Sequence, residues 1–111
     1  MARFLTLGYG DRAGYDRTAD DVLAAAHAHD ARLQADGIPM GVLGPPVQVR
    51  NHDAAGVVTE AGPFLFSGLP IAGFALVEAA TLEEAVALVS RTPCAVARGV
   101  VEVWPVEDAP G

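Results

Sequence analysis

The sequence of 111 residues contains no lysine and a single cysteine, Cys94. The missing lysine excludes a Schiff base on a lysine amine and a phosphate-binding loop that depends on a lysine. One cysteine cannot form an internal disulfide, which agrees with a reducing compartment and predicts a cytoplasmic location. Free cysteines are mostly small packing residues, so we predict a structural role for Cys94, with a nucleophile as the alternative.

Positive charge is also scarce. Seven arginines stand against fourteen carboxylates, which gives a formal net charge of −7, and no segment resembles a basic patch. Direct binding to nucleic acid is therefore not expected. The chain has no long apolar run, and its first residues lead directly into a predicted strand, so neither a signal peptide nor a membrane span is expected. The usual metal, nucleophile and phosphate-loop motifs are missing, so we expect no metal and no cofactor.

The second half of the chain alternates strand, helix and strand patterns. The apolar segment 71–78 predicts a strand. Thr81 and Glu84 have the spacing of a capping box, which predicts that a helix begins at Thr81. The apolar residues predicted to share one face of this helix are Leu82, Ala85, Val86 and Val89. Pro93 cannot continue the helix, and residues 100–106 predict the returning strand.

The first half repeats this order. Residues 4–9 predict a strand, and Thr18 with Asp21 predicts the start of a helix that ends at Asp36-Gly37. The residues predicted to share its buried face are Val22, Ala26, His29 and Leu33. A short strand follows at 38–43. The hairpin predicted next has arms at 47–50 and 56–59 and the tip Asn51-His52-Asp53.

The complete order is therefore β-α-β, hairpin, β-α-β. It predicts an α+β, ferredoxin-like fold with an antiparallel sheet. A length of 111 residues, of which 51% are hydrophobic, suits one domain over 1–111, and no change in composition marks an internal boundary.

Several short motifs follow one another along nearly the whole chain. They are Leu43-Gly44-Pro45-Pro46, Val49-Arg50, Val58-Thr59, Gly62-Pro63-Phe64, Gly73-Phe74, Leu82-Glu83-Glu84-Ala85 and Val101-Glu102-Val103. In this combination the chain resembles the DGPF branch of the YCII-related family. The resemblance implies a small ferredoxin-like protein that pairs as a dimeric α+β barrel, with a pocket near the dimer interface. Members of that family are mostly of unknown activity; a few resemble enzymes acting on small chlorinated aromatics, and some are associated with alternative sigma factors.

The chain departs from the family pattern around its central motif. Ala61 stands where the family has an aspartate before Gly62, and Trp104 stands in the place of a usual arginine. The segment 65–70 carries none of the charges that follow Phe64 in the family. Either a less polar ligand or a loss of the family's activity would follow from these changes.

Alternation along the first and last strands predicts the two faces of the sheet. The residues predicted to face the helices are Leu5, Leu7, Val101 and Val103. The residues predicted on the helix-free side are Phe4, Thr6, Gly8, Glu102 and Trp104. That second set is too apolar for open water and too polar for a core, so it pairs with a second subunit, lines a ligand pocket, or does both.

His29 and Glu102 are the candidate catalytic residues. An imidazole titrates near neutrality and suits a general base, while the alternative for His29 is a hydrogen-bonded core histidine. Relatives place a histidine on the first helix and an acid after the first strand, which here would be Asp11. If the helix begins near Thr18, His29 lies eleven residues, or about 16 Å, along it, too far for that pair. His27 is about 3 Å closer but faces away from the apolar stripe.

The candidate ligand-binding residues are Thr6, Arg50, Phe64 and Trp104. Arg50 ends a hairpin arm and suits a bidentate grip on a carboxylate or phenolate, with an ordinary surface ion pair as the alternative.

Two functions are compatible with the sequence. The first is a homodimeric, cofactor-free enzyme of lyase or isomerase type that moves a proton on a small aromatic or enol-type molecule. Glu102 or His29 would move the proton, and Arg50 would hold the anion. The second is a non-catalytic accessory or regulatory protein that keeps the barrel and binds a ligand or partner without the family's charged site.

Overall fold

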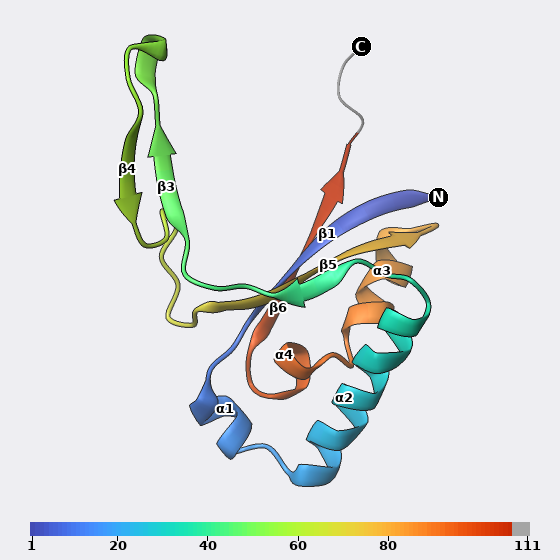
Figure 1. The fold of residues 1–111 in the computed structure, drawn as a ribbon. Coiled ribbons are helices and arrows are strands. Elements are labelled where there is room, and N and C mark those ends of the chain that lie inside the picture. The colour runs from blue at the N-terminus through green and yellow to red at the C-terminus, as the bar shows by residue number, and fades with distance from the viewer. Residues whose placement is uncertain (108–111) are drawn as a thin grey trace.

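The computed structural model describes residues 1–107, in which a four-stranded sheet carries the helices on one side (Figure 1). In spatial order its strands are β2 (Met40–Val42), β5 (Ile71–Ala79), β1 (Ala2–Tyr9) and β6 (Val100–Val106). All neighbouring strands are antiparallel. This order, with helices after β1 and β5, is that of a ferredoxin-like α+β fold, so the predicted fold class is confirmed.

The α-helices within residues 1–107 are α1 (Arg12–Asp16), α2 (Asp20–Ala35), α3 (Leu82–Val89) and α4 (Pro93–Val96). The predicted capping box of α3 is confirmed. The Thr81 hydroxyl accepts from the Glu84 N–H at 3.1 Å, and the Glu84 carboxylate accepts from the Ala80 N–H at 3.0 Å. Gly37 follows α2 with φ 85°, a conformation that favours glycine and ends the helix as predicted. No helix of the described residues is long and apolar enough to cross a membrane.

The predicted start of α2 at Thr18 is wrong. Helix α2 begins at Asp20, and Thr18 instead donates its hydroxyl to the Gly14 carbonyl at 2.7 Å. The physical reason is the short helix α1, which the sequence pattern did not predict and whose last turn Thr18 closes. Asp11 caps the other end of α1, because its carboxylate accepts from the Gly14 N–H at 2.9 Å.

The core lies between the sheet and helices α2 and α3. Its buried cluster is Phe4, Ala75, Val77, Ala79, Ala85 and Val89, with Val101 and Val103 packed against it. Of the predicted α2 stripe, Ala26, His29 and Leu33 are buried and Val22 is exposed. Of the predicted α3 stripe, Ala85 and Val89 are buried, whereas Leu82 and Val86 are half-exposed at 45% and 47%. The buried stripes are therefore narrower than the sequence pattern predicts.

The predicted faces of β1 are wrong, although those of β6 are right. Phe4 and Thr6 are buried against the helices, and Leu5 and Leu7 lie on the helix-free side. The register fixes this arrangement, since Leu5 pairs with Trp104 and each such pair shares a face. Burial of Thr6 is tolerated because its hydroxyl donates to the Ala75 carbonyl at 3.1 Å.

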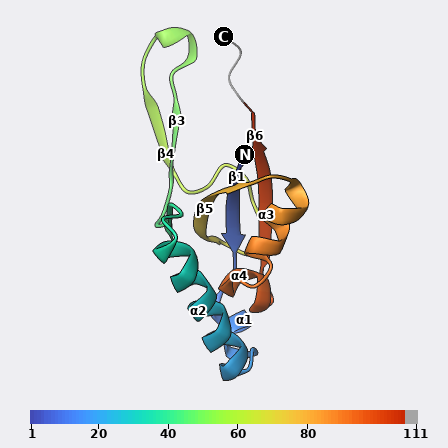
Figure 2. The same ribbon diagram turned by 90° about the vertical axis from the view of Figure 1, so that its right-hand side faces the viewer.

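The hairpin forms a separate two-stranded sheet of β3 (Val47–Arg50) and β4 (Val58–Ala61), named here the arm (residues 47–61). The second strand starts two residues later than predicted, because Asn51 accepts from the Gly56 N–H at 3.0 Å and residues 51–57 form the loop. The arm projects from the sheet on the side away from the helices (Figures 1 and 2). The radius of gyration is 16.2 Å, against about 13 Å for a compact chain of this length. The arm is thus an extension that the main core does not cover.

Candidate functional site

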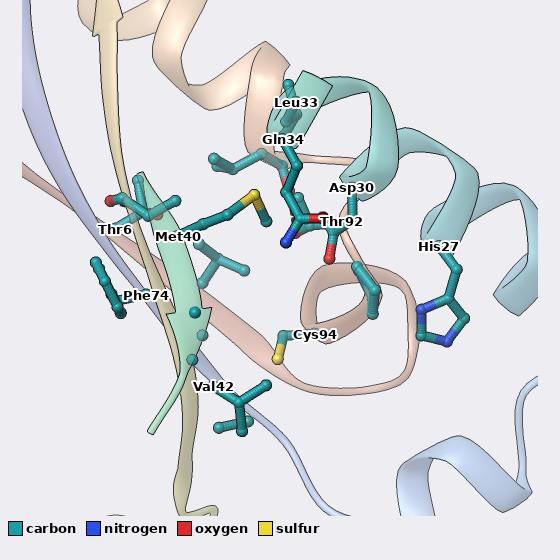
Figure 3. A pocket seen from close by; sticks show the side chains of 18 of the residues that line it. Thr6, His27, Asp30, Leu33, Gln34, Met40, Val42, Phe74, Thr92 and Cys94 are labelled. Atoms are coloured by element: carbon teal, nitrogen blue, oxygen red, sulfur yellow. Dashed lines mark hydrogen bonds between the residues drawn. The ribbon is translucent and has the colours of Figure 1, made fainter. Parts of the chain in front are cut away.

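A cavity of about 280 Å³ lies between the sheet and helices α2 and α4, and it is named here the helix-side cavity. Strands β1, β2 and β5 supply its floor, including Thr6 and Met40. Leu33 and Gln34 reach it from α2, while Thr92 and Cys94 reach it from the start of α4 (Figure 3). It is therefore on the side of the sheet opposite to the one that the sequence predicted for a pocket.

Gly8 and Gly99 allow α4 and the residues after it to pack directly against the end of β1, at one side of the cavity. A Cβ at Gly99 would overlap the Tyr9 carbonyl oxygen, and one at Gly8 would lie 2.9 Å from the Cys94 sulfur. The Cys94 thiol is half-buried there. Burial, followed by the nearby charge of Asp30, raises the pKa of the Cys94 thiol, which keeps it protonated and agrees with a packing role.

Asp30 is the acidic residue of the helix-side cavity. It is half-buried, and its Oδ1 atom is buried without a hydrogen-bond partner among the residues that the structure describes. Burial raises the pKa of the Asp30 carboxyl, and electrostatic interaction with the neighbouring His27 and His29 offsets part of this effect. A buried acceptor without a donor costs free energy, so a hydrogen-bond donor beside Asp30 would be favourable.

The other titratable residues at the cavity are Tyr15, His27 and Cys94. The rings of Tyr15 and His27 lie 6.1 Å apart between centroids, where α1 and α2 approach each other. Burial is the main cause that raises the pKa of the Tyr15 hydroxyl. No arginine is among the described residues that line the cavity, so it offers an apolar wall and a carboxylate rather than a cationic grip.

His29, the first predicted catalytic residue, lies between α2 and α3 rather than at this cavity. Its side chain is buried, and Nε2 lies 2.6 Å from the Leu88 carbonyl oxygen. A carbonyl oxygen can only accept, so Nε2 carries the hydrogen and donates it. Nδ1 then faces a guanidinium nitrogen of Arg32 at 3.5 Å. This geometry is that of a hydrogen-bonded core histidine.

Glu102, the second predicted catalytic residue, lies on the helix-free face of the sheet. Its carboxylate accepts from the Tyr9 hydroxyl at 2.5 Å. This hydrogen bond is the main cause that raises the pKa of the Tyr9 hydroxyl, with burial and the charge of Glu102 adding to it. Trp104 follows on the same face and is 51% exposed. The sheet therefore separates Glu102 from His29, and the two do not form a joint site.

The predicted ligand-binding residues are divided among three places. Thr6 lines the helix-side cavity, Trp104 lies on the helix-free face, and Arg50 on the arm lines a hollow with Phe64, which follows the arm. The Arg50 guanidinium lies 3.4 Å from the Glu60 carboxylate and 5.8 Å from the centroid of the Phe64 ring. Arg50 is thus engaged in an ion pair and a cation–π contact on the arm.

The family-like motifs meet at the base of the arm. The Gly62 N–H donates to the Pro46 carbonyl at 3.1 Å, which joins the Gly44-Pro45-Pro46 and Gly62-Pro63-Phe64 segments. Gly62 has φ 99°, a conformation that few other residues adopt. A shallow hollow there is lined by Pro46, Arg50, Gly62, Pro63 and Phe64, among others.

Sequence reasoning did not identify Asp30, Tyr15 or Thr92, and it placed His27 away from the buried stripe. One available signal was the position of Asp30, four residues after the buried Ala26 and therefore at the edge of that stripe. Among residues 1–107, no group of three or more histidine, cysteine, aspartate or glutamate side chains is arranged to hold a metal ion.

Comparison of this chain with models of known protein families and with curated proteins finds no match. The described residues thus form a ferredoxin-like α+β fold with a cavity between the sheet and helices α2 and α4.

Proposed function

We propose that this protein binds a small, mainly apolar molecule in the helix-side cavity. The observation that carries this proposal is an apolar cavity with one unpartnered carboxylate oxygen, that of Asp30, at its side. A cavity of about 150 Å³ holds one benzene molecule, whereas drug-sized ligands use pockets of roughly 300–1,000 Å³. At about 280 Å³ the cavity suits one aromatic ring with a short side chain.

Binding without catalysis is the function that the geometry supports best. His29 uses its ring nitrogens within the core, and Glu102 lies across the sheet from the cavity. Arg50, the proposed anion holder, is paired on the arm. None of these three residues is therefore available to a molecule in the helix-side cavity.

Proton transfer on the helix-free face is the second candidate. It is favoured by the short hydrogen bond between the Tyr9 hydroxyl and Glu102, beside the exposed ring of Trp104. An aromatic or enol-type molecule stacked on Trp104 could exchange a proton with Glu102. A dimer would have to leave room for such a molecule on this face.

The protein forms a homodimer through the helix-free face in this proposal. The side chains there form three cross-strand rows: Glu78-Arg3-Val106, Leu76-Leu5-Trp104 and Phe74-Leu7-Glu102. The middle row is entirely apolar, and Leu5 and Trp104 are partly exposed. A sheet face of this composition in a single domain requires a cover.

The arm supports the same dimer. A face of four strands about 4.8 Å apart, which average about seven residues of about 3.3 Å each, measures roughly 440 Å². A stable interface buries about 800 Å² on each partner, so the sheet face alone supplies about half. The arm projects on this same side and exposes Val47, Val49 and Val58, which would supply further contact with a second copy (Figure 1).

We also propose that the chain is a member of the DGPF branch of the YCII-related family. It is supported by the ferredoxin-like strand order and by the motif segments that meet at Gly62. A cytoplasmic location is part of it as well, supported by the single unpaired cysteine.

A thermal-shift screen with single-ring aromatic molecules tests the proposed binding site. The variant Thr92→Phe places a ring in the cavity, and Thr59→Phe adds the same ring on the exposed strand β4 as a matched control. We expect a stabilising molecule to lose its effect in Thr92→Phe and to keep it in Thr59→Phe. Equal stabilisation of both variants would locate the molecule elsewhere and contradict the proposal.

A further inference from the structure

The helix-side cavity contains an acceptor that the protein itself does not satisfy. Oδ1 of Asp30 is buried without a partner within residues 1–107, while the hydroxyl of Thr92 already donates to the Val89 carbonyl at 2.7 Å. The hydroxyl of Thr6 likewise donates to the Ala75 carbonyl. The carboxylate of Asp30 is therefore the polar group of the cavity lining for which the described residues supply no donor at Oδ1, so a ligand that carries a hydrogen-bond donor suits it.

The charge around this acceptor determines which donor suits it. No arginine is present among the described residues that line the cavity, and His27 is the one basic side chain there. The whole chain has a net charge of −7. A carboxylate or phenolate would meet the like charge of Asp30 in a half-buried place that no arginine lines, which costs free energy. A cation would gain both the hydrogen bond and the attraction to the carboxylate.

We propose that the ligand of the helix-side cavity carries a cationic amine and that Asp30 is its counter-ion. This inference rests on the proposed function, which puts the ligand in this cavity. The volume of about 280 Å³ limits the molecule to about one ring and a two-carbon chain. The ammonium lies at Asp30, and the ring lies against apolar side chains such as Leu33, Met40 and Val89. The ligand class is thus a small arylalkylamine rather than an aromatic acid.

The affinity of the proposed amine for Asp30 should also depend on pH. The titratable groups near Asp30 are His27 and His29 on α2, Tyr15 on α1 and Cys94 on α4. Lowering the pH protonates Asp30, whose pKa is raised by burial. The carboxylate then loses the charge that attracts a cation, so binding of the amine weakens as the pH falls. A neutral ligand of the same shape would not show this loss through Asp30.

Isothermal titration calorimetry with three probes of similar shape tests the inference: 2-phenylethylamine, 2-phenylethanol and phenylacetate. At neutral pH we expect the amine to bind at least about tenfold more tightly than the alcohol, and phenylacetate not to bind measurably. Asp30→Asn is expected to weaken amine binding at least about tenfold and to leave alcohol binding within about threefold. Asp36→Asn, which neutralises an exposed carboxylate at the end of the same helix, is the matched control and should bind the amine as the wild type does.

The outcomes separate this inference from the proposed function. Equal or tighter binding of the alcohol or the acid in the wild type would overturn the amine assignment and leave the cavity as a binding site. Unchanged amine binding in Asp30→Asn would overturn the role of Asp30 in the same way. Binding of none of the three probes would overturn the inference and would also count against the proposed function.

Discussion

Replacing Trp104 by alanine is expected to break the proposed homodimer while each subunit stays folded. Trp104 lies on the helix-free face and is 51% exposed, outside the buried core cluster. A tryptophan presents up to about 250 Å², so about 130 Å² is available for burial, worth about 3 kcal/mol at about 25 cal/mol per Å². A two-fold interface contains the residue twice, which doubles this upper estimate to about 6 kcal/mol. Since imperfect burial and association costs reduce it, we expect about 3 kcal/mol, or dissociation about 100-fold easier.

Sedimentation equilibrium over a range of protein concentrations measures this effect. Leu82→Ala is the matched control, because Leu82 is also a large apolar residue, 45% exposed, but lies on α3 on the opposite side of the sheet. The wild type and Leu82→Ala should be dimers at micromolar concentration, and Trp104→Ala should be a folded monomer. A monomeric wild type, or a Trp104→Ala dimer as strong as the wild type, would refute the proposed interface.

Three further predictions concern single subunits. Gly99→Ala should lower the free energy of unfolding in urea by more than about 2 kcal/mol, because its Cβ overlaps the Tyr9 carbonyl, whereas Gly56→Ala, which meets open space, should change it by less than about 0.5 kcal/mol. Similar values for both would contradict the close approach. Glu102→Gln should lower the pKa of Tyr9 toward its ordinary value, since the hydrogen bond to the carboxylate raises it, and an unchanged tyrosinate absorbance titration would argue against that bond. Asp30→Asn should raise the melting temperature at neutral pH, because a raised pKa means that the folded state penalises the ionised carboxyl. The destabilisation by the ionised carboxyl is complete above the folded-state pKa and vanishes below the unfolded-state pKa of about 3.9. A difference in melting temperature between Asp30→Asn and the wild type that does not change with pH would contradict this prediction.

Most of the fold could be predicted from the sequence because the long elements carry clear local signals. The capping box at Thr81 and the glycine stop at Gly37 mark helix ends through hydrogen bonds and backbone conformation that act within a few residues. The short helices α1 and α4 were not predicted, since helices of five and four residues contain too few turns for a periodic pattern. Thr18 was consequently assigned to the wrong helix.

The faces of β1 could not be predicted because both sets of alternating residues are largely apolar. Phe4 and Thr6 on one side, and Leu5 and Leu7 on the other, give no polar face to choose against. Which face of β1 points toward the helices depends on the register between β1 and β6. It also depends on the space between the sheet and the helices, where Gly8 leaves room for Cys94. Both are properties of the folded chain.

The cavity was missed for a related reason. Asp30 and Thr92 are far apart in the sequence and come together because α2 packs against α4. Neither residue belongs to a motif with a characteristic spacing. The residues that do stand out in the sequence are His29 and Arg50. Their polar groups bind partners within the protein, the Leu88 carbonyl and the Glu60 carboxylate.

Amide chemical-shift mapping during a titration with 2-phenylethylamine tests the central claim most directly, because it locates the ligand on the intact protein. The helix-side cavity predicts that the largest changes occur at residues 30–34 on α2, at 40–42 on β2, and at 89–94, from the end of α3 to the start of α4. Changes confined to the hollow at residues 47–50 and 62–64 would contradict this claim. Changes confined to the strand residues around Glu102 and Trp104, without changes on α2 and α4, would contradict it as well.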